Sequence, residues 1–258
     1  MTDMSPKIPC KQCPLRGTGA FSANSDAEIK FIQHMKKREI SVGAGSSILR
    51  EGDDRKALYT LLSGWAFRYR TLSDGRRHIF NFLLPGDFIG LQHKLDARHP
   101  HGVETLTEST LCVFPSDRLW DLYRTHPTLG FDITWLTAHE ELIVDENLLS
   151  VGRRSAAERI ATLLIHLYKR AERIGMVEPN GLRLPLNQQH IADALGLSLV
   201  HTNMTLKRLQ AAGLYTLKKR LPEAGEPRRD GASGRLLCAA AAPPAADLAT
   251  EQKCLTFP

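Results

Sequence analysis

Residues 187–214 read NQQHIADALGLSLVHTNMTLKRLQAAGL, and this stretch decides the fold of the C-terminal part of the chain. Gln188–Leu195 has the apolar spacing of a short helix. Gly196 follows, where a tight turn between two helices favours a residue that tolerates a positive φ. Ser198 can cap a second helix that runs from Leu199 to about Ala212. The length and punctuation of this stretch predict a helix-turn-helix.

One side of the second predicted helix faces the domain core, and the other side is exposed to a binding partner. Its inward line is Thr202, Leu206 and Leu209. A helix of this size fits the major groove of B-DNA, which is about 12 Å wide, with its N-terminal residues at base edges. There Asn203 could pair with adenine, and His201 could donate to guanine or to a phosphate. Lys207 and Arg208 would hold phosphates. The predicted DNA-contacting residues are Gln188, Ser198, His201, Thr202, Asn203, Lys207 and Arg208.

Charge is distributed unevenly along the 258 residues, whose net charge is +6. Residues 1–150 hold 18 Lys/Arg and 19 Asp/Glu, whereas residues 151–258 hold 16 and 9. The basic half contains the predicted helix-turn-helix, which favours double-stranded DNA as the partner. A well-solvated basic surface, or a helical hairpin inside an all-α enzyme, is the alternative interpretation.

Several protein classes are excluded by composition. The chain is 42% hydrophobic and 24% charged, which is typical of globular proteins. It has no stretch near the roughly 20 consecutive apolar residues that a membrane helix needs, so we expect no membrane partner. Met1 to Pro9 lacks the apolar segment of a secretion signal. We therefore expect a cytoplasmic protein.

From Ser47 to about Pro115 the sequence has the texture of β-structure. Short apolar runs alternate with turn signals there. Between Trp65 and Thr71, aromatic and arginine residues alternate, as in a strand with one buried face. Asp74-Gly75 separates two such runs and predicts a hairpin. The region therefore predicts a β-sandwich or barrel.

After Pro115 the pattern becomes helical. Ser116–Tyr123 predicts a short helix, and Pro127 can begin a long one that runs to about Val151. One apolar line on the long helix contains Leu129, Ile133, Leu136 and Ile143; a second contains Phe131, Trp135, Leu142 and Leu149. Two lines exceed what one small core can cover, so we expect the helix to pair with its copy in a second subunit. The residues assigned to this dimer contact are Leu129, Ile133, Leu136 and Ile143. Burial within the same chain is the alternative.

These elements predict five segments. Residues 1–24 are an N-terminal arm with a C-x-x-C motif, 25–125 a β-roll sensor domain, 126–152 a dimerisation helix and 153–221 the helix-turn-helix domain. Residues 222–258 are rich in Pro and Ala, cannot support a core, and are predicted to be disordered.

Together these features resemble the CRP/FNR family of bacterial transcription regulators over about residues 8–220. The matching residues are Gly52-Asp53, Ser63-Gly64, Asp74-Gly75-Arg76, Leu84–Gly90 and Ile191–Ser198. The resemblance implies an α+β fold: an N-terminal β-roll, which is a cyclic-nucleotide-binding-like jelly roll, then a long dimerisation helix and a C-terminal winged helix-turn-helix. It implies a homodimer without enzyme activity that binds a two-fold DNA site and contacts RNA polymerase.

The resemblance argues against cAMP as the effector. Members that bind cAMP have Glu after the glycine equivalent to Gly90, and an Arg-Ser/Thr pair for the cyclic phosphate. Here Leu91-Gln92-His93 and His101-Gly102-Val103 occupy these places. The arginine fork that would pair with the phosphate is therefore missing.

The FNR branch of the family holds a [4Fe–4S] cluster through four cysteines. By similarity, Cys10 and Cys13 match the first two ligands and Cys112 matches the last, but the third falls at about Gly19. A His or Asp ligand, or a thiol–disulfide switch between Cys10 and Cys13, would still provide a response to redox state or oxygen. Inert thiols are the alternative.

The recognition helix departs from the FNR pattern as well. FNR-like members have Glu, Ser and Arg where this chain has Val200, Asn203 and Met204. This difference predicts an operator unlike the usual FNR half-site.

Two alternatives belong to other functional classes. His99, His101 and Glu104 resemble half of the metal motif of a cupin-like enzyme. The N-terminal cysteines would also suit an iron–sulfur protein without any DNA function.

Overall fold

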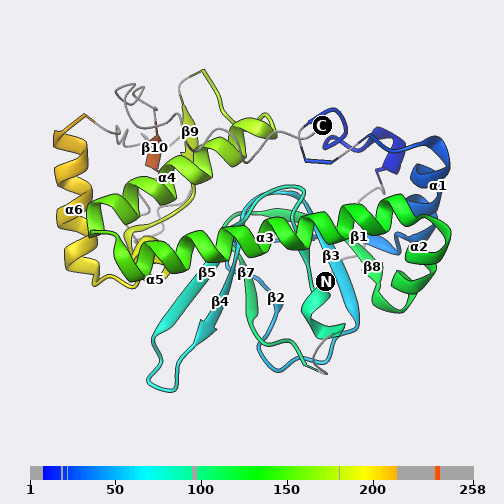
Figure 1. The fold of residues 1–258 in the computed structure, drawn as a ribbon, viewed down its shortest axis with the longest axis horizontal. Coiled ribbons are helices and arrows are strands. Elements are labelled where there is room, and N and C mark those ends of the chain that lie inside the picture. The colour runs from blue at the N-terminus through cyan, green and yellow to red at the C-terminus, as the bar shows by residue number, and fades with distance from the viewer. Residues whose placement is uncertain are drawn as a thin grey trace.

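The computed structural model describes residues 8–213, except residues 19, 22, 95–97 and 180, together with residues 236–238. The described chain has the expected α+β architecture: a β-sandwich, a long helix and a helical C-terminal domain (Figure 1). Among the described residues, no helix is long and apolar enough to cross a membrane.

The sandwich consists, within the described residues, of two four-stranded sheets with antiparallel pairing. The first sheet has the order β1 (Arg38–Val42), β8 (Ser109–Pro115), β3 (Ala57–Ser63) and β6 (Phe88–Ile89). The second has the order β2 (Ser47–Leu49), β7 (Gly102–Thr105), β4 (Ala66–Thr71) and β5 (Arg77–Leu83). Leu49, Leu61 and Leu111 are fully buried between the sheets. The predicted hairpin joins β4 to β5, with Gly75 at φ 84°.

Short helices cover the outer face of the first sheet. They are η1 (Cys10–Gln12), α1 (Asp26–Met35), η3 (Ser116–Arg118) and α2 (Leu119–Thr125), and η2 (Leu91–Lys94) follows β6. Ser25 opens α1 through a capping box with Glu28. Met35, Leu58, Phe114 and Leu122 are buried together in this layer.

The long helix α3 (Pro127–Arg153) runs across most of the width of the molecule in Figure 1. Leu129, Ile133 and Ile143 are buried within their own chain, and Leu136 is half-buried beside the outer face of the first sheet. The assignment of Leu129, Ile133 and Ile143 to the dimer contact is therefore wrong, whereas that of Leu136 stays a prediction. The outer face of the sandwich needs an apolar cover, and helical spacing alone does not reveal which neighbour a stripe meets.

The C-terminal domain follows the long helix α3. Its elements are α4 (Ala156–Arg173), β9 (Leu182–Leu184), α5 (Gln188–Leu195), α6 (Leu199–Ala211) and β10 (Leu236–Cys238). A capping box between Ser155 and Glu158 opens α4. Strand β10 pairs antiparallel with β9. Most of residues 222–258 lies outside the described residues, but the disorder expected there does not hold for Leu236–Cys238.

The C-terminal domain shares a hydrophobic core with the outer face of the second sheet. Phe67, Ile79 and Phe82 from the sandwich form one buried cluster with residues of α4, α5 and α6, including Ile191 and Leu195. Along the sequence, these two domains are separate segments. The structure shows that each one covers apolar surface of the other.

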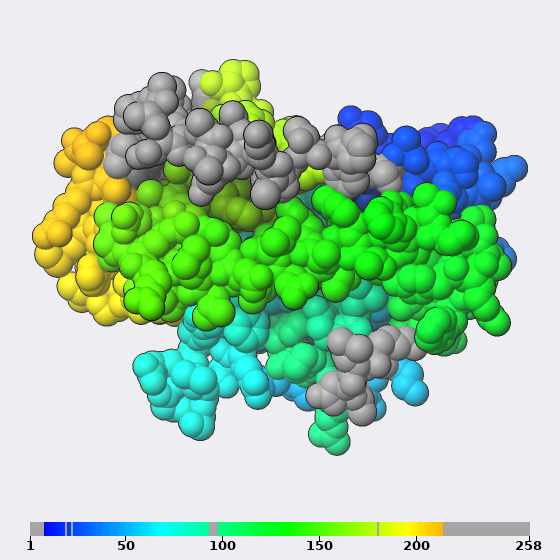
Figure 2. All heavy atoms as spheres, viewed as in Figure 1, coloured from blue at the N-terminus to red at the C-terminus, as the bar shows by residue number. Residues whose placement is uncertain are grey.

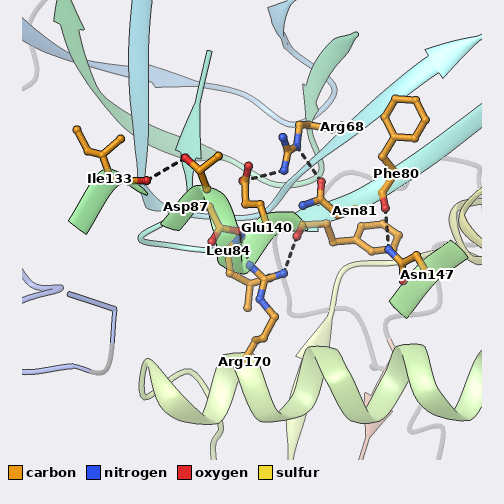
Figure 3. A network of polar contacts seen from close by, with 11 residues as sticks. Arg68, Phe80, Asn81, Leu84, Asp87, Ile133, Glu140, Asn147 and Arg170 are labelled. Carbon is orange, nitrogen blue, oxygen red and sulfur yellow. Dashed lines mark hydrogen bonds and ion pairs between the residues drawn. The ribbon is translucent and has the colours of Figure 1, made fainter. Parts of the chain in front are cut away.

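A polar network fastens α3 and α4 to this sheet (Figure 3). Arg68 on β4 donates to Asn81 at 2.9 Å and forms an ion pair with Glu140 of α3 at 2.7 Å. Arg170 of α4 pairs with Asp87 at 2.5 Å and also donates to the Phe82 carbonyl oxygen at 2.9 Å. Both helices are therefore held to the second sheet through charged groups as well as apolar contacts.

We predict that Glu140→Ala lowers the free energy of unfolding by about 3 kcal/mol, because it leaves the buried Arg68 charge without its partner. The side chains of Arg68 and Glu140 are 7% and 19% exposed, and burial raises the pKa of Glu140 against the opposing effect of Arg68. Urea denaturation measures the change. Glu51→Ala, which removes an exposed partner of Arg70, is the control and should cost less than about 1 kcal/mol. The double variant Arg68→Met/Glu140→Leu should recover most of the loss; an equal loss in that variant would contradict the prediction.

Candidate nucleic-acid interface

The helix-turn-helix forms as the sequence predicts. Asn187 caps α5, and its side chain accepts a hydrogen bond from the His190 amide. Gly196 ends α5 in the left-handed region at φ 63°. The Ser198 hydroxyl then accepts from the His201 amide at 3.2 Å and so caps α6. These local hydrogen bonds set where both helices begin and how the turn between them is built.

The inner face of α6 packs against α4 and α5. Thr202, Thr205, Leu206 and Leu209 are buried there. Thr202 is 0% exposed, so its inclusion among the DNA contacts is wrong. The structure confirms instead the other prediction for Thr202, which placed it on the inward line of this helix. Its position in the i, i+4, i+7 line turns it toward the domain core.

The outer side of α6 lies at one end of the molecule (Figure 1). Val200, Met204 and Lys207 are exposed and lie three or four residues apart, which places them on one face. Asn203 flanks this face and is half-buried; its side-chain oxygen accepts a hydrogen bond from the Gln188 amide nitrogen at 3.3 Å. Ser198, His201 and Arg208 are also exposed around it. Six of the seven predicted contacts are thus brought together on one accessible surface.

The second sheet supports this surface through α5. Arg77 at the start of β5 pairs with Asp193 of α5 at 3.2 Å. Its guanidinium also lies over the rings of Phe67 and Tyr69, at 4.8 Å and 5.5 Å. His190 of α5 lies against the Phe67 ring, and burial lowers the pKa of His190 to about 4, so its ring is uncharged near neutral pH. Since α5 packs against α6, the position of the recognition helix depends on the β4–β5 strands.

Two domain models match the chain. Residues 39–126 match the cyclic nucleotide-binding domain, and residues 158–222 match the Crp-like helix-turn-helix domain. The nitrogen fixation regulation protein FixK of Rhizobium meliloti is 33% identical over 174 residues, which cover 67% of this chain and 76% of that protein. The chain belongs to the CRP/FNR family of transcription regulators. It is therefore a DNA-binding regulator and not an enzyme.

Further relatives cover most of the chain. The FixK protein of Bradyrhizobium diazoefficiens is 29% identical over 208 residues, or 81% of this chain and 86% of that protein. The solved structure of FixK2 from Bradyrhizobium japonicum superposes with a TM-score of 0.63 at 26% identity, covering 77% of this chain and 91% of that one. The likeness includes the sandwich, the long helix and the helix-turn-helix domain.

Three cysteines meet at one place in the N-terminal domain. Cys10, Cys13 and Cys112 line an apolar cavity of about 510 Å³ between the N-terminal arm, the first sheet and α3. Burial raises the pKa of Cys10, and it raises that of Cys112 to about 12, so both thiols are protonated near neutral pH. Among the described residues, no group of three or more His, Cys, Asp or Glu side chains could hold a metal ion. With glycine at position 19, these residues do not fit the four-cysteine cluster of the FNR branch.

Around His101, which lies where the resemblance places the cyclic phosphate, polar side chains make contacts within the protein. Arg68 is the buried cation of that region, and Glu140 and Asn81 already engage it. Nearby, burial and the charge of Arg68 lower the pKa of His101 to about 4. His99 donates from Nε2 to the Arg55 carbonyl oxygen at 2.9 Å. That cAMP is not the effector stays a prediction from the sequence.

The cupin-like interpretation fails at the same residues. Glu104 approaches Arg77, at 3.8 Å, and forms no metal-binding group with His99 and His101 in the described part of the chain.

We predict different losses for Lys207 and Asn203 of α6. Lys207→Ala should weaken binding by a similar factor on every DNA sequence and reduce the slope of log K against log salt by about 1, because we expect Lys207 to contact phosphate. Asn203→Ala should weaken binding to the specific site by about tenfold or more, and leave non-specific binding unchanged, because we expect Asn203 to contact a base. Fluorescence anisotropy titrations at several salt concentrations measure both. Equal losses of Asn203→Ala on specific and random duplexes would show that this residue does not read bases.

Proposed function

We propose that this protein is a homodimeric transcription regulator that binds a two-fold DNA site in the cytoplasm and changes its affinity in response to a signal at the β-roll domain. The observation that carries the proposal is the accessible face of α6, with Gln188, Asn203 and Lys207 around one end of the molecule. A regulator bound at a DNA site beside a promoter would be able to contact RNA polymerase. The family membership supports the proposal.

The dimer contact is proposed at the uncovered side of α3. Phe131, Leu142, Leu148 and Leu149 are 66%, 59%, 70% and 50% exposed. Figure 2 shows that α3 lies open across one face of the molecule. An apolar strip on a helix of 27 residues, about 40 Å long, is more than an isolated subunit usually leaves in water. A second copy of α3 is the complementary surface that a two-fold axis would supply.

This arrangement gives the signal a mechanical route. Two recognition helices must lie about 34 Å apart to enter successive major grooves. A change in how the two α3 helices meet would alter that separation. The cysteine-lined cavity is also bordered by Trp135 and Leu136 of α3 and by Arg173 of α4. A change in this cavity therefore acts directly on the dimer helix and on the DNA-binding domain.

A redox signal is the candidate favoured by the thiols in that cavity. Oxidation of Cys10 and Cys13 by diamide would form one disulfide, with two electrons and two protons passing to the reagent. Cys13 is half-exposed and would be the entry point for the oxidant, whereas Cys112 is buried.

We predict that Leu142→Glu/Leu149→Glu produces a monomer, because it places charge in the proposed contact. Light scattering after size-exclusion chromatography measures the mass. Affinity for the two-fold site should fall by about 100-fold, because the second half-site is lost. Ile165→Glu, at an exposed apolar residue of α4, should remain a dimer. A folded double variant that stays dimeric would refute this contact.

We predict that diamide changes the affinity for DNA at least fivefold and that dithiothreitol reverses the change. Cys13→Ser should abolish the response, whereas Cys112→Ala should keep it. Iron analysis after anaerobic purification should find less than one iron per chain, because the described donors do not fit a cluster. Four irons per chain, or an unchanged response in Cys13→Ser, would overturn the thiol switch.

A further inference from the structure

The recognition helix presents large apolar side chains where polar ones are usual for reading bases. Val200 is 70% exposed and Met204 is 51% exposed, and they lie one helical turn apart on the outward face of α6. Leu199, at the first helical position, is 46% exposed on the flank of Asn203. Burying such side chains in a groove is favourable only where they meet apolar atoms.

The major groove offers one large apolar feature for these side chains. Thymine has a 5-methyl group, whereas guanine presents the acceptors N7 and O6, and cytosine presents an amino donor. Val200 and Met204 have no N–H or O–H donor for guanine and no strong acceptor for cytosine. A guanine or cytosine opposite them would lose hydrogen bonds to water without replacement.

The neighbouring polar residues are arranged for adenine. The Asn203 side-chain oxygen accepts from Gln188 and retains a second lone pair, and its amide nitrogen keeps its two donors for a base. An adenine supplies the donor N6 and the acceptor N7 that match this pair. Gln188 acts as a positioning residue because its hydrogen bond sets which way the Asn203 amide faces.

The charged residues of α6 do not supply an alternative reading of G·C pairs. No Asp or Glu occurs between residues 199 and 211, so there is no carboxylate to accept from cytosine. Lys207 and Arg208 lie in the third turn, farther from the N-terminal end that meets base edges. His201 is the donor in the first turn, and it lies on the opposite flank from Asn203.

We propose that Val200 and Met204 read the methyl groups of two thymines in each half-site, next to an adenine that Asn203 reads. This inference rests on the proposed function, in which α6 enters the major groove. The core of the operator is therefore rich in A·T pairs, and its thymines are recognised through their methyl groups and not by hydrogen bonds.

The experiment begins with selection of binding sites from a random duplex library by the full-length protein. Each thymine of the selected half-site is then replaced by deoxyuridine, which lacks only the 5-methyl group. Affinity should fall about fourfold at each of two positions, the effect of leaving one methyl-sized group unburied. Replacement at the other thymines should leave the affinity unchanged.

Matched variants assign the two positions. Met204→Ala should remove the deoxyuridine effect at one position and Val200→Ala at the other, while each leaves the effect at its partner's position intact. Both side chains are exposed, so neither variant disturbs the buried core of the domain. Gln210→Ala, at another exposed position of α6, is the control and should retain both effects.

The outcomes separate the inference from the proposed function. Methyl readout would be overturned if deoxyuridine did not change binding to the selected half-site, or if G·C pairs stood opposite Val200 and Met204. Either result would leave the proposed function as a DNA-binding regulator standing. Failure to enrich any sequence would reject sequence-specific DNA binding itself, and the inference with it. Two methyl-dependent positions assigned by Val200 and Met204 would establish the inference.

Discussion

The packing of the helix-turn-helix domain against the outer face of the second sheet is the contact on which the rest of this structure depends. Phe67, Ile79 and Phe82 lie in one buried cluster with the apolar residues of α4, α5 and α6. The Arg77–Asp193 ion pair, and the stacking of Arg77 on Phe67, tie α5 to the same strands. Close-packed contacts shift between discrete arrangements more readily than they deform. In the proposed mechanism, a change in the second sheet would therefore move α6 as a unit.

The long helix α3 serves several neighbours at once. Leu129 and Ile133 cover the outer face of the first sheet, whereas Glu140 and Asn147 bind the second sheet through Arg68 and the Phe80 carbonyl oxygen (Figure 3). The opposite line remains in water in the single subunit. The cysteine-lined cavity lies against its first half. Signal, dimerisation and DNA spacing therefore converge on one rigid element in the proposed mechanism.

The outward face of α6 shows why family membership does not determine what a regulator reads. Local capping and the Gly196 turn build the same helix-turn-helix that the family shares. The base-facing side chains are free to vary because they do not contribute to the core. Val200 and Met204 supply apolar surface there, whereas Thr202 and Leu206 are buried and contribute only to packing of the core.

The sequence by itself determined the local structure of this protein: the Asp74-Gly75 hairpin, the Gly196 turn, the Ser198 cap and the boundaries of α3 and α6. These features depend on backbone preferences and on hydrogen bonds between residues a few positions apart, and such signals are readable along the chain. Only the tertiary structure decided which apolar line of α3 is covered, that Thr202 is buried, that the two domains share a core and that β10 returns to β9. Those features depend on contacts between residues that are far apart in the sequence. The periodicity of apolar residues shows which face of a helix or strand is buried, but it does not show which element packs against that face.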